Sequence, residues 1–246
     1  SGGIPTTVVI ALIAAVLSGA SAGILTRYAQ SAGAHTLQIT FTRLFLASIV
    51  VGIPALTRYR AELRQISRRD LLVTMFAGLW MATHFFLWVS SLENVGVMIA
   101  TVLVTSSPLW TAVLEVTFLR ARLTRVLMIG LAAVIAGNVL ITLAGGQGVS
   151  GANPPLGAAL AISAALAIAV QRVLSRGVRT RVHLIPFLWI LYSSAASALF
   201  IVALVTRTPL TGYSSDAGFW ILMITIFPQL IGHSSSNYAL RYLPAT

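Results

Sequence analysis

The sequence lacks both cysteine and lysine. Without cysteine the chain forms no disulfide bond and offers no thiolate as a nucleophile or metal ligand. Without lysine it has neither the phosphate-binding loop of P-loop nucleotidases nor a residue for Schiff-base catalysis. The sixteen basic residues are therefore all arginines, and only five acidic residues balance them, which gives a net charge of +11.

Charged residues of either sign are also scarce. They make up 9% of the 246 residues, against about 25% in an ordinary soluble domain. Hydrophobic residues make up 57%, and the mean hydropathy is +0.92. A soluble fold of this size needs more polar surface, which argues against a soluble enzyme or a secreted scaffold. The composition predicts an all-α fold, a polytopic membrane helix bundle.

Eight apolar segments are long enough to cross a bilayer, which takes about 20 apolar residues. The longest polar connectors, 58–70 and 145–155, are too short to form a domain, so we expect the function to be carried out between helices. The predicted spans are Val8–Ala29, Leu37–Thr57, Leu71–Leu92, Val97–Leu119, Val126–Ala144, Leu156–Leu174, Leu184–Val205 and Phe219–Leu240.

The arginines lie mostly in the connectors between these spans. The odd-numbered connectors hold only Arg27 and Arg207, and all the others except Arg43 lie in or beside the even-numbered connectors or after the eighth span. The positive-inside rule predicts a multi-pass protein of the cell inner (cytoplasmic) membrane whose N-terminus and even connectors are cytoplasmic. Because the charge follows membrane topology, we expect the lipid bilayer as a partner and no nucleic acid.

The two halves of the sequence are similar to each other. The exits of the third and eighth spans, 90–96 and 238–244, align at an offset of 148 residues, and the first and sixth spans are both rich in small residues. If the sixth span restarts the pattern of the first, the repeat unit has five helices. Because five is an odd number, the second copy is inverted in the membrane relative to the first. Such repeats are typical of alternating-access transporters, although channels also contain them. The predicted domains are 4–148, the first repeat, and 149–246, an incomplete second repeat.

A five-helix unit predicts ten spans, whereas the sequence ends at Thr246, where a ninth span would begin. Three explanations stand: a shortened chain, a chain of which only a part is given, or a genuine eight-span protein. We favour the first two. Ser1–Gly3, without an initiator methionine, are interpreted as the remnant of an affinity tag.

Three stretches carry a resemblance to a known family. The longest, 88–124, combines the exit Ser-Ser-Leu-Glu-Asn-Val, a helix of small residues, Ser-Pro-Leu-Trp and then Leu-Arg-Ala-Arg-Leu-Thr; the others are 42–45 and 238–243. In this order they resemble the EamA-type branch of the drug/metabolite transporter superfamily, to which YddG-type aromatic amino acid exporters belong. The resemblance implies ten helices, a central cavity and export of small metabolites or drugs. The sequence departs from the family's frequent residues at Ser18 and at 120–121.

The third span carries Trp80, His84 and Trp88 at i, i+4 and i+8, a spacing that places them along one helix face. A histidine at membrane depth costs free energy unless it pairs or faces water. The two indole rings offer stacking surfaces and N–H donors, so we expect this face to bind substrate. The alternative is that the tryptophans pack or anchor at the interface and that His84 bonds a backbone carbonyl.

The eighth span is the most polar, and it carries Gln229, His233 and Asn237 at helical spacing, together with Ser236. Pro228 interrupts it and frees a backbone carbonyl, which a bilayer tolerates only where protein or water satisfies that group. We expect these polar residues to bind substrate as well, because the third and eighth spans are equivalent in the predicted repeat. The alternative is that the polar side chains only hold helices together.

Pro108 interrupts the fourth span, and Trp110 follows two residues later. We expect Trp110 to bind substrate, and Pro108 either to act as a gating hinge or to form a fixed kink. The other hinge candidates are Pro228 and the pair Gly19 and Gly23 in the first span, although such a glycine pair also favours close helix packing.

Three further polar or aromatic residues lie inside predicted spans. Arg43 lies about 9 Å from the outer end of the second span, at 1.5 Å per residue. Its side chain is long enough to snorkel to the interface, to bind helix-terminal carbonyls or to meet a substrate carboxylate. Trp189 and Tyr192 lie near the cytoplasmic end of the seventh span, where anchoring at the interface is expected.

The sequence shows no carboxylate pair, HExxH motif or Ser/His/Asp arrangement, so we expect neither an enzyme, nor a cofactor, nor a bound metal. The favoured function is a secondary transporter that exports small organic metabolites or drugs by alternating access, as a monomer. The expected small-molecule substrates are amino acids and aromatic or cationic solutes. The alternative is a channel or a non-transporting membrane interaction protein.

Overall fold

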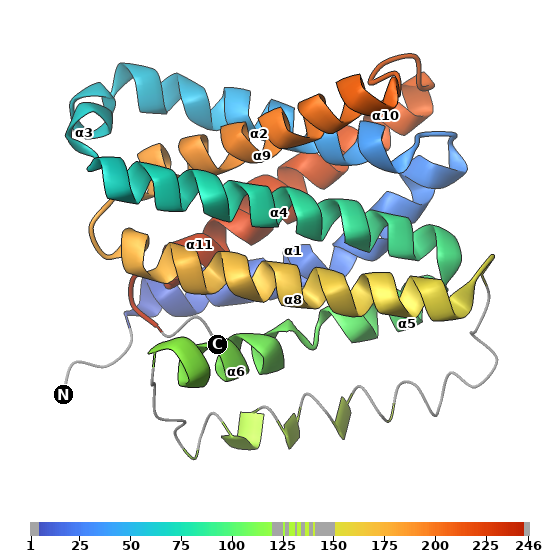
Figure 1. Cartoon of the computed structure of the whole chain (residues 1–246), viewed down its shortest axis with the longest axis horizontal. Coiled ribbons are helices and arrows are strands. Elements are labelled where there is room, and N and C mark those ends of the chain that lie inside the picture. The colour runs from blue at the N-terminus through green and yellow to red at the C-terminus, as the bar shows by residue number, and fades with distance from the viewer. Residues whose placement is uncertain are drawn as a thin grey trace. The chain divides into compact units, whose positions relative to one another are not determined.

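The computed structural model describes residues 5–119, 125, 128–130, 132–133, 136–137, 140 and 151–243, which form helices and connectors with no strand among them (Figure 1). They divide into two compact units. Unit 1 contains residues 5–82 and 174–243, and unit 2 contains the described residues within 83–173. The elements are α1 (Thr6–Ser31), α2 (Thr36–Thr57), α3 (Arg60–Gln65), α4 (Arg68–Asn94), α5 (Val97–Val104), α6 (Ser107–Leu119), α8 (Pro154–Arg179), α9 (Leu184–Thr206), α10 (Ser215–Ile224), the π-helix η1 (Thr225–His233) and α11 (Ser234–Ala239).

Seven helical segments of the described residues are long and apolar enough to cross a membrane. They correspond to seven of the eight predicted spans, so the all-helical, multispanning class is confirmed for the described part of the chain. The predicted fifth span, Val126–Ala144, lies mostly outside the described residues. The boundary between the predicted repeats, at residue 148, also lies outside them. The two units do not coincide with those repeats, which stay a prediction.

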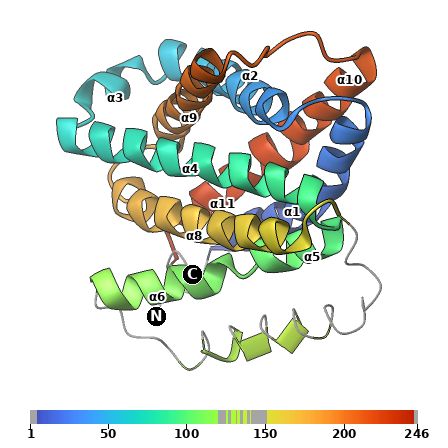
Figure 2. The ribbon, with the colours of Figure 1, turned by 45° about the vertical axis from the view of Figure 1, so that its right-hand side comes forward.

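In unit 1, α2 and α9 lie side by side (Figures 1 and 2). A Cβ atom added at Gly52 would lie 2.9 Å from the indole nitrogen of Trp189, so the glycine lets the two helices approach closely. The N-terminal part of α4 approaches α9 in the same way: a Cβ at Gly78 would lie 2.7 Å from Cβ of Ser194 and 2.8 Å from the carbonyl oxygen of Leu191. Glycine at these two positions therefore sets the helix spacing in unit 1.

The three consecutive helical segments of the eighth span, α10, η1 and α11, pack along α1. Tyr28 stacks on Trp220 with ring centroids 4.7 Å apart. Further along, Gly232 lies against the side chain of Ser18, with the carbonyl oxygen of Ala15 close by. Aromatic stacking at one end and a small residue at the other thus hold α1 against the eighth span.

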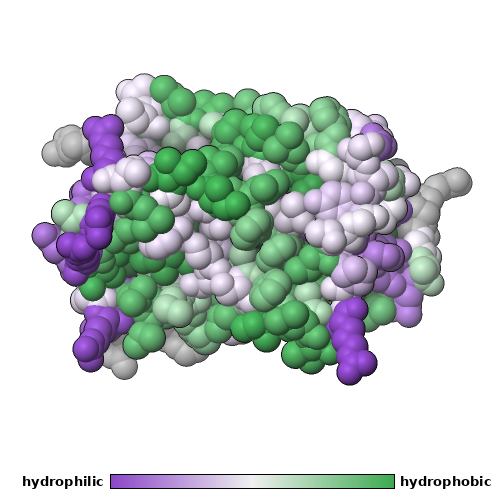
Figure 3. All heavy atoms as spheres, turned by 90° about the horizontal axis from the view of Figure 1, so that it is seen from above, coloured by the Kyte–Doolittle hydropathy of each residue, from purple (hydrophilic) through white to green (hydrophobic). Residues whose placement is uncertain are grey.

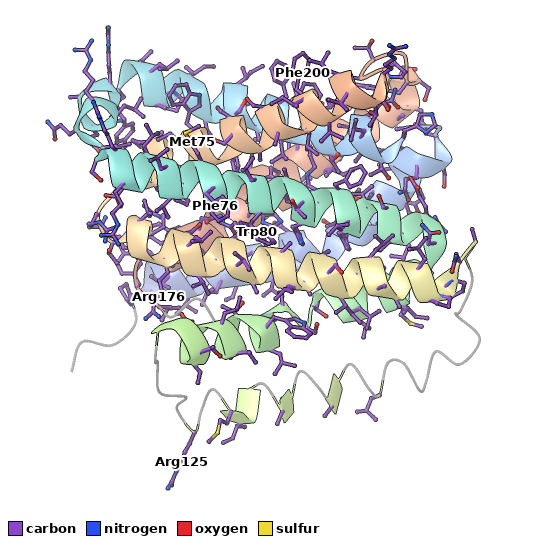
Figure 4. The ribbon with its side chains drawn as sticks, viewed as in Figure 1. Met75, Phe76, Trp80, Arg125, Arg176 and Phe200 are labelled. Atoms are coloured by element: carbon purple, nitrogen blue, oxygen red, sulfur yellow. The ribbon has the colours of Figure 1, made fainter. Side chains whose placement is uncertain are left out.

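Large apolar side chains cover the outer surface of the spans. Val16 on α1 is 69% exposed and Val205 on α9 is 79% exposed. The face over α2 and α9 is mostly apolar across its middle, with hydrophilic side chains gathered at its two ends (Figure 3). Met75, Phe76 and Phe200 also project outward from their helices (Figure 4). So much exposed apolar surface is what lipid contact requires.

The second and sixth connectors, both rich in arginine, meet at one end of unit 1. Arg181, between α8 and α9, forms an ion pair of 2.5 Å with Asp70 in the first turn of α4. Tyr59, just before α3, stacks on His183 with ring centroids 4.5 Å apart. The hydrogen bond from Arg181 to the Asp70 carboxylate raises the pKa of the guanidinium, which therefore stays charged. The two connectors lie on the same side, as their arginine content predicts.

The connectors that follow α1 and α9 meet at the opposite end of unit 1. Gln38 donates its amide to the carbonyl oxygen of Thr211 at 3.1 Å, and the Ser214 hydroxyl donates to that of Ala32 at 3.0 Å. Arg207, which ends α9 with a φ of 53°, is the single arginine in the sequence of these two connectors. The asymmetry of arginine between the two ends of unit 1 is therefore a property of the fold as well as of the sequence.

Unit 2 consists of the C-terminal part of α4, the helices α5 and α6, and most of α8. The start of α8 lies against the end of α4, where a Cβ at Gly157 would lie 2.7 Å from Cβ of Val95. Arg172 of α8 donates to the hydroxyl of Ser107 on α6 at 3.1 Å. The predicted sixth span ends at Leu174, but α8 continues to Arg179. Arginine is a good helix former, so the helix outlasts its apolar stretch.

Candidate functional site

The eighth span changes helix type at its centre. α10 ends at Ile224, the π-helix η1 follows, and α11 begins at Ser234. Pro228 lies inside η1 and has no N–H to donate to the carbonyl of Ile224, so a regular α-helix cannot continue through it. The interruption that Pro228 predicts thus takes the form of a π-helix. Such helices, in which hydrogen bonds close on the fifth residue, are rare and frequent at functional sites.

The π-helix changes which polar residues share a face. The i, i+4 spacing predicts Gln229, His233 and Asn237 side by side, but Ser234, at i+5, takes the place beside Gln229. The N–H of Ser234 donates to the Gln229 carbonyl oxygen, and its hydroxyl lies 3.5 Å from the same atom. Gln229 and Asn237 are buried, whereas His233 and Ser236 are half-buried.

Arg43 on α2 is fully buried and contacts η1. Its Nη2 donates to Oε1 of Gln229 at 3.0 Å, and both side chains are 0% exposed. Arg43 therefore does not snorkel to the interface, because its partner lies inside unit 1. Nε2 of Gln229, in contrast, is buried with no hydrogen-bond partner among the described residues. A donor left in this state costs free energy that a ligand oxygen would recover.

Tyr192 on α9 lies on the other side of Gln229. Its hydroxyl lies 3.0 Å from Oγ of Ser234 and 3.5 Å from the carbonyl oxygen of Gln229, and the side chain is fully buried. Anchoring of Tyr192 at the interface is therefore wrong, because the hydroxyl finds its partners within unit 1. We call Arg43, Tyr192, Gln229 and Ser234 the buried polar cluster.

The predicted residues of the third span divide between the two units. Trp80, in unit 1, is half-buried and meets Phe76 edge to face, with ring centroids 6.2 Å apart (Figure 4). In unit 2, Nδ1 of His84 lies 2.9 Å from the carbonyl oxygen of Ala164 on α8. A carbonyl only accepts, so Nδ1 carries the proton. His84 thus makes the backbone hydrogen bond of the alternative interpretation, and substrate binding by this face stays a prediction.

Two tryptophans of unit 2 present donors for a ligand. The side chain of Trp88 is buried and that of Trp110 is half-buried. Neither indole N–H has a hydrogen-bond partner in the described part of the chain. Buried indole N–H groups usually find one. The predicted role of both residues in substrate binding is compatible with this state.

The hinge candidates occupy different environments. The fourth span breaks between α5 and α6, and Pro108 lies in the first turn of α6, where its missing N–H is tolerated. Gly19 has no atom within 4 Å of the place of a Cβ, whereas Gly23 is buried. Close approach to α1 occurs at Gly232 instead, where a Cβ would lie 3.2 Å from Cβ of Ser18. The gating roles of these residues stay predictions.

Metal ligation finds no support in the described residues, among which no three His, Asp or Glu side chains gather in a way that could hold an ion. The apolar exterior and the seven long helices define the class first: a multi-pass α-helical membrane protein. The model of the EamA-like transporter family matches residues 6–143. Because this match covers more than half of the chain, the protein belongs to the EamA-like transporter family. Membership in a family of transporters supports the prediction that the protein is not an enzyme.

One solved structure, described only as "Crystal structure of protein", has a similar fold. The TM-score is 0.69 at 19% sequence identity, and the alignment covers 97% of this chain and 80% of that chain. At this identity the likeness shows the fold alone. No curated protein matches the chain.

Proposed function

We propose that the protein is a secondary transporter that exports small organic solutes across the cell inner membrane by alternating access. The observation that carries this proposal is the buried polar cluster, in which a π-helix holds polar groups against a buried arginine. Charged and polar groups inside spans are costly and mark substrate pathways. Irregular backbone at membrane depth is tolerated only where it is buried in protein or lines a cavity. Membership in a transporter family supports the same function.

The pairing of the spans supports an inverted repeat. In a five-helix repeat the first span corresponds to the sixth and the third to the eighth. In unit 1 the first span packs along the eighth, and in unit 2 the third contacts the sixth through His84 and Ala164. In the predicted repeat these two pairs correspond to each other. The second and seventh spans also correspond to each other, and they pack side by side.

The substrates that the proposal favours are neutral, zwitterionic or cationic, with aromatic amino acids first, as for the YddG-type exporters. Stacking on an indole ring contributes about 0.5–1.5 kcal/mol beyond area burial, and a cation over such a ring gains about 0.5–2 kcal/mol. Trp80, Trp88 and Trp110 offer such rings. A nucleotide or sugar phosphate would need several arginines at one place, and the buried polar cluster contains one, Arg43.

The proposed orientation places the arginine-rich end of unit 1 in the cytoplasm, together with the N-terminus. The ion pair between Asp70 and Arg181 supports it, because this contact puts two arginine-rich connectors on one side. Export rather than uptake is proposed from the resemblance to exporters. Gly19, Gly23, Pro108 and Pro228 are the proposed points of movement, and the protein is proposed to act as a monomer.

Counterflow in proteoliposomes tests the transport function. Vesicles that contain the purified protein are loaded with unlabelled L-phenylalanine and diluted into a trace of the radiolabelled compound. A transporter with an alternating site accumulates label transiently, whereas a channel lets the label equilibrate without an overshoot. The same assay runs with a panel of amino acids, nucleosides and cationic drugs. The proposal fails if no compound gives an overshoot above protein-free vesicles.

A further inference from the structure

Resting on the proposed transport function, we infer that the buried polar cluster binds the carboxylate of a zwitterionic substrate, with Arg43 and Gln229 as its ligands. Arg43 is 0% exposed, and its Nη2 donates to the amide oxygen of Gln229. That oxygen occupies a position that a carboxylate oxygen of a ligand would take. In this structure the neutral amide oxygen of Gln229 thus accepts the hydrogen bond that the charged carboxylate of a ligand would accept from Arg43.

The chemistry of the two side chains fits a carboxylate. A guanidinium presents its donors as a planar fork that matches the two oxygens of a carboxylate. A carboxylate that takes the place of Oε1 requires the Gln229 amide to turn, and Nε2, which has no partner among the described residues, then donates to the carboxylate. The hydrogen bond of the Arg43 guanidinium to a neutral amide is thereby replaced by a hydrogen bond to a negatively charged carboxylate. Such bonds are the strong ones in a low-dielectric interior.

The charge of the cluster sets the class of ligand. One guanidinium pairs with one carboxylate, so the cluster matches a solute that presents a single carboxylate. A phosphate monoester carries about −1.5 to −2 charges, which is more than one guanidinium can pair with. A solute without a carboxylate gains nothing from Arg43. The cluster therefore selects a single carboxylate over a cation or a phosphate, and the zwitterion follows from the amino acid substrates of the proposed function.

The members of the cluster differ in their exposure. Arg43, Tyr192 and Gln229 are fully buried, but Ser234 is half-buried and lies at the junction of η1 and α11. It is therefore the member of the cluster that has exposed surface. Its hydroxyl holds Tyr192 at 3.0 Å.

The alternative role for the cluster is a clamp that only ties α2 and α9 to the eighth span. The two roles differ in their response to Gln229→Glu. This variant places a carboxylate on Arg43 from within the protein, which strengthens a clamp but competes with a ligand carboxylate. Gln65→Glu, at the exposed end of α3, is the matched control, because it makes the same chemical change at the surface.

The experiment measures binding to the purified protein by tryptophan fluorescence and transport by counterflow. The probes are L-phenylalanine and L-phenylalaninamide, which has the same ring and amine but no carboxylate. We expect the wild type and Gln65→Glu to bind phenylalanine at least about tenfold more tightly than the amide. In Gln229→Glu the affinity for phenylalanine falls by about tenfold or more, and the affinity for the amide does not fall. Arg43→Gln removes the same preference.

Three results overturn the inference. If the wild type binds the amide as well as phenylalanine, or if Gln229→Glu keeps the preference, the cluster is not a carboxylate site, although transport of the amide would leave the proposed function standing. If no compound of the panel gives counterflow, the proposed function fails and the inference fails with it. If either variant elutes as an aggregate, the inference is tested by the wild type alone, from its affinities for phenylalanine and for phenylalaninamide.

Discussion

At the scale of single residues, the glycines of unit 1 fall into two kinds. Gly78 lies where α4 meets α9, and a Cβ atom there would come within 2.8 Å of the backbone carbonyl oxygen of Leu191. Gly19 lies on the exposed side of α1 and faces open space. The same amino acid is thus essential for helix packing at one position and free of packing constraints at the other.

A pair of alanine substitutions separates these two kinds. We expect Gly78→Ala to lower the free energy of unfolding by about 1–3 kcal/mol, because an added methyl group meets backbone that cannot move aside. Gly19→Ala should leave it unchanged or raise it by up to about 1 kcal/mol, because alanine is the better helix former. Unfolding in mixed micelles measures both. Equal effects of the two substitutions would contradict the described packing of α4 on α9.

The hydrogen bond of His84 permits a second residue-scale prediction. His84→Leu removes the donor to the Ala164 carbonyl oxygen, and we expect the free energy of unfolding to fall by about 0.6 kcal/mol, the average for such bonds between membrane helices, and by no more than about 1.7 kcal/mol. His84→Asn retains an N–H close to the place of Nδ1 and should lose less. The same unfolding assay compares the two variants. If leucine is as stable as histidine, the bond does not hold α4 to α8.

Part of the candidate site is predictable from residue types alone. Gln229 and Asn237 stand out because polar side chains within an apolar span need a reason to be there, and both are buried. Arg43 and Tyr192 are harder, because the sequence allows both to reach the interface. Their placement depends on partners from the eighth span, 186 and 37 to 42 residues away in the chain.

At the scale of helices, the spans follow from hydropathy because each has to match the bilayer thickness. The boundaries of α2 and α9 differ from the predicted ones by one residue at most. Hydropathy does not distinguish helix types, because an α-helix and a π-helix of the same composition have the same mean hydropathy. The nine residues of η1 and the break between α5 and α6 therefore had only the two prolines as their signals.

Pro228→Ala tests the cause of the π-helix. Alanine supplies the missing N–H and removes the ring that clashes with the preceding turn, so the span can wind as an α-helix. We expect the free energy of unfolding to rise by about 1 kcal/mol, the net value of one hydrogen bond, while the initial rate of counterflow falls. If the variant is more stable and transports as fast as the wild type, the π-helix η1 is not needed for transport.

At the scale of the whole molecule, the arginine asymmetry gives an orientation that can be measured directly. The chain lacks cysteine, so Gln65→Cys in α3 and Thr211→Cys in the connector before α10 each create a single thiol. In intact cells a membrane-impermeant maleimide should label residue 211 and leave residue 65 unlabelled until the cells are permeabilised. The reverse pattern would place the arginine-rich end outside and contradict the positive-inside rule for this protein.

The π-helix η1 decides which side chain stands beside Gln229. In the π register, Ser234 stands next to Gln229 and holds Tyr192. Wound as an α-helix, the same segment would bring His233 next to Gln229 and turn Ser234 away by about one residue's rotation, or 100°. In the winding that the structure shows, the hydroxyl of Ser234 and not the imidazole of His233 therefore stands beside the buried arginine and its glutamine.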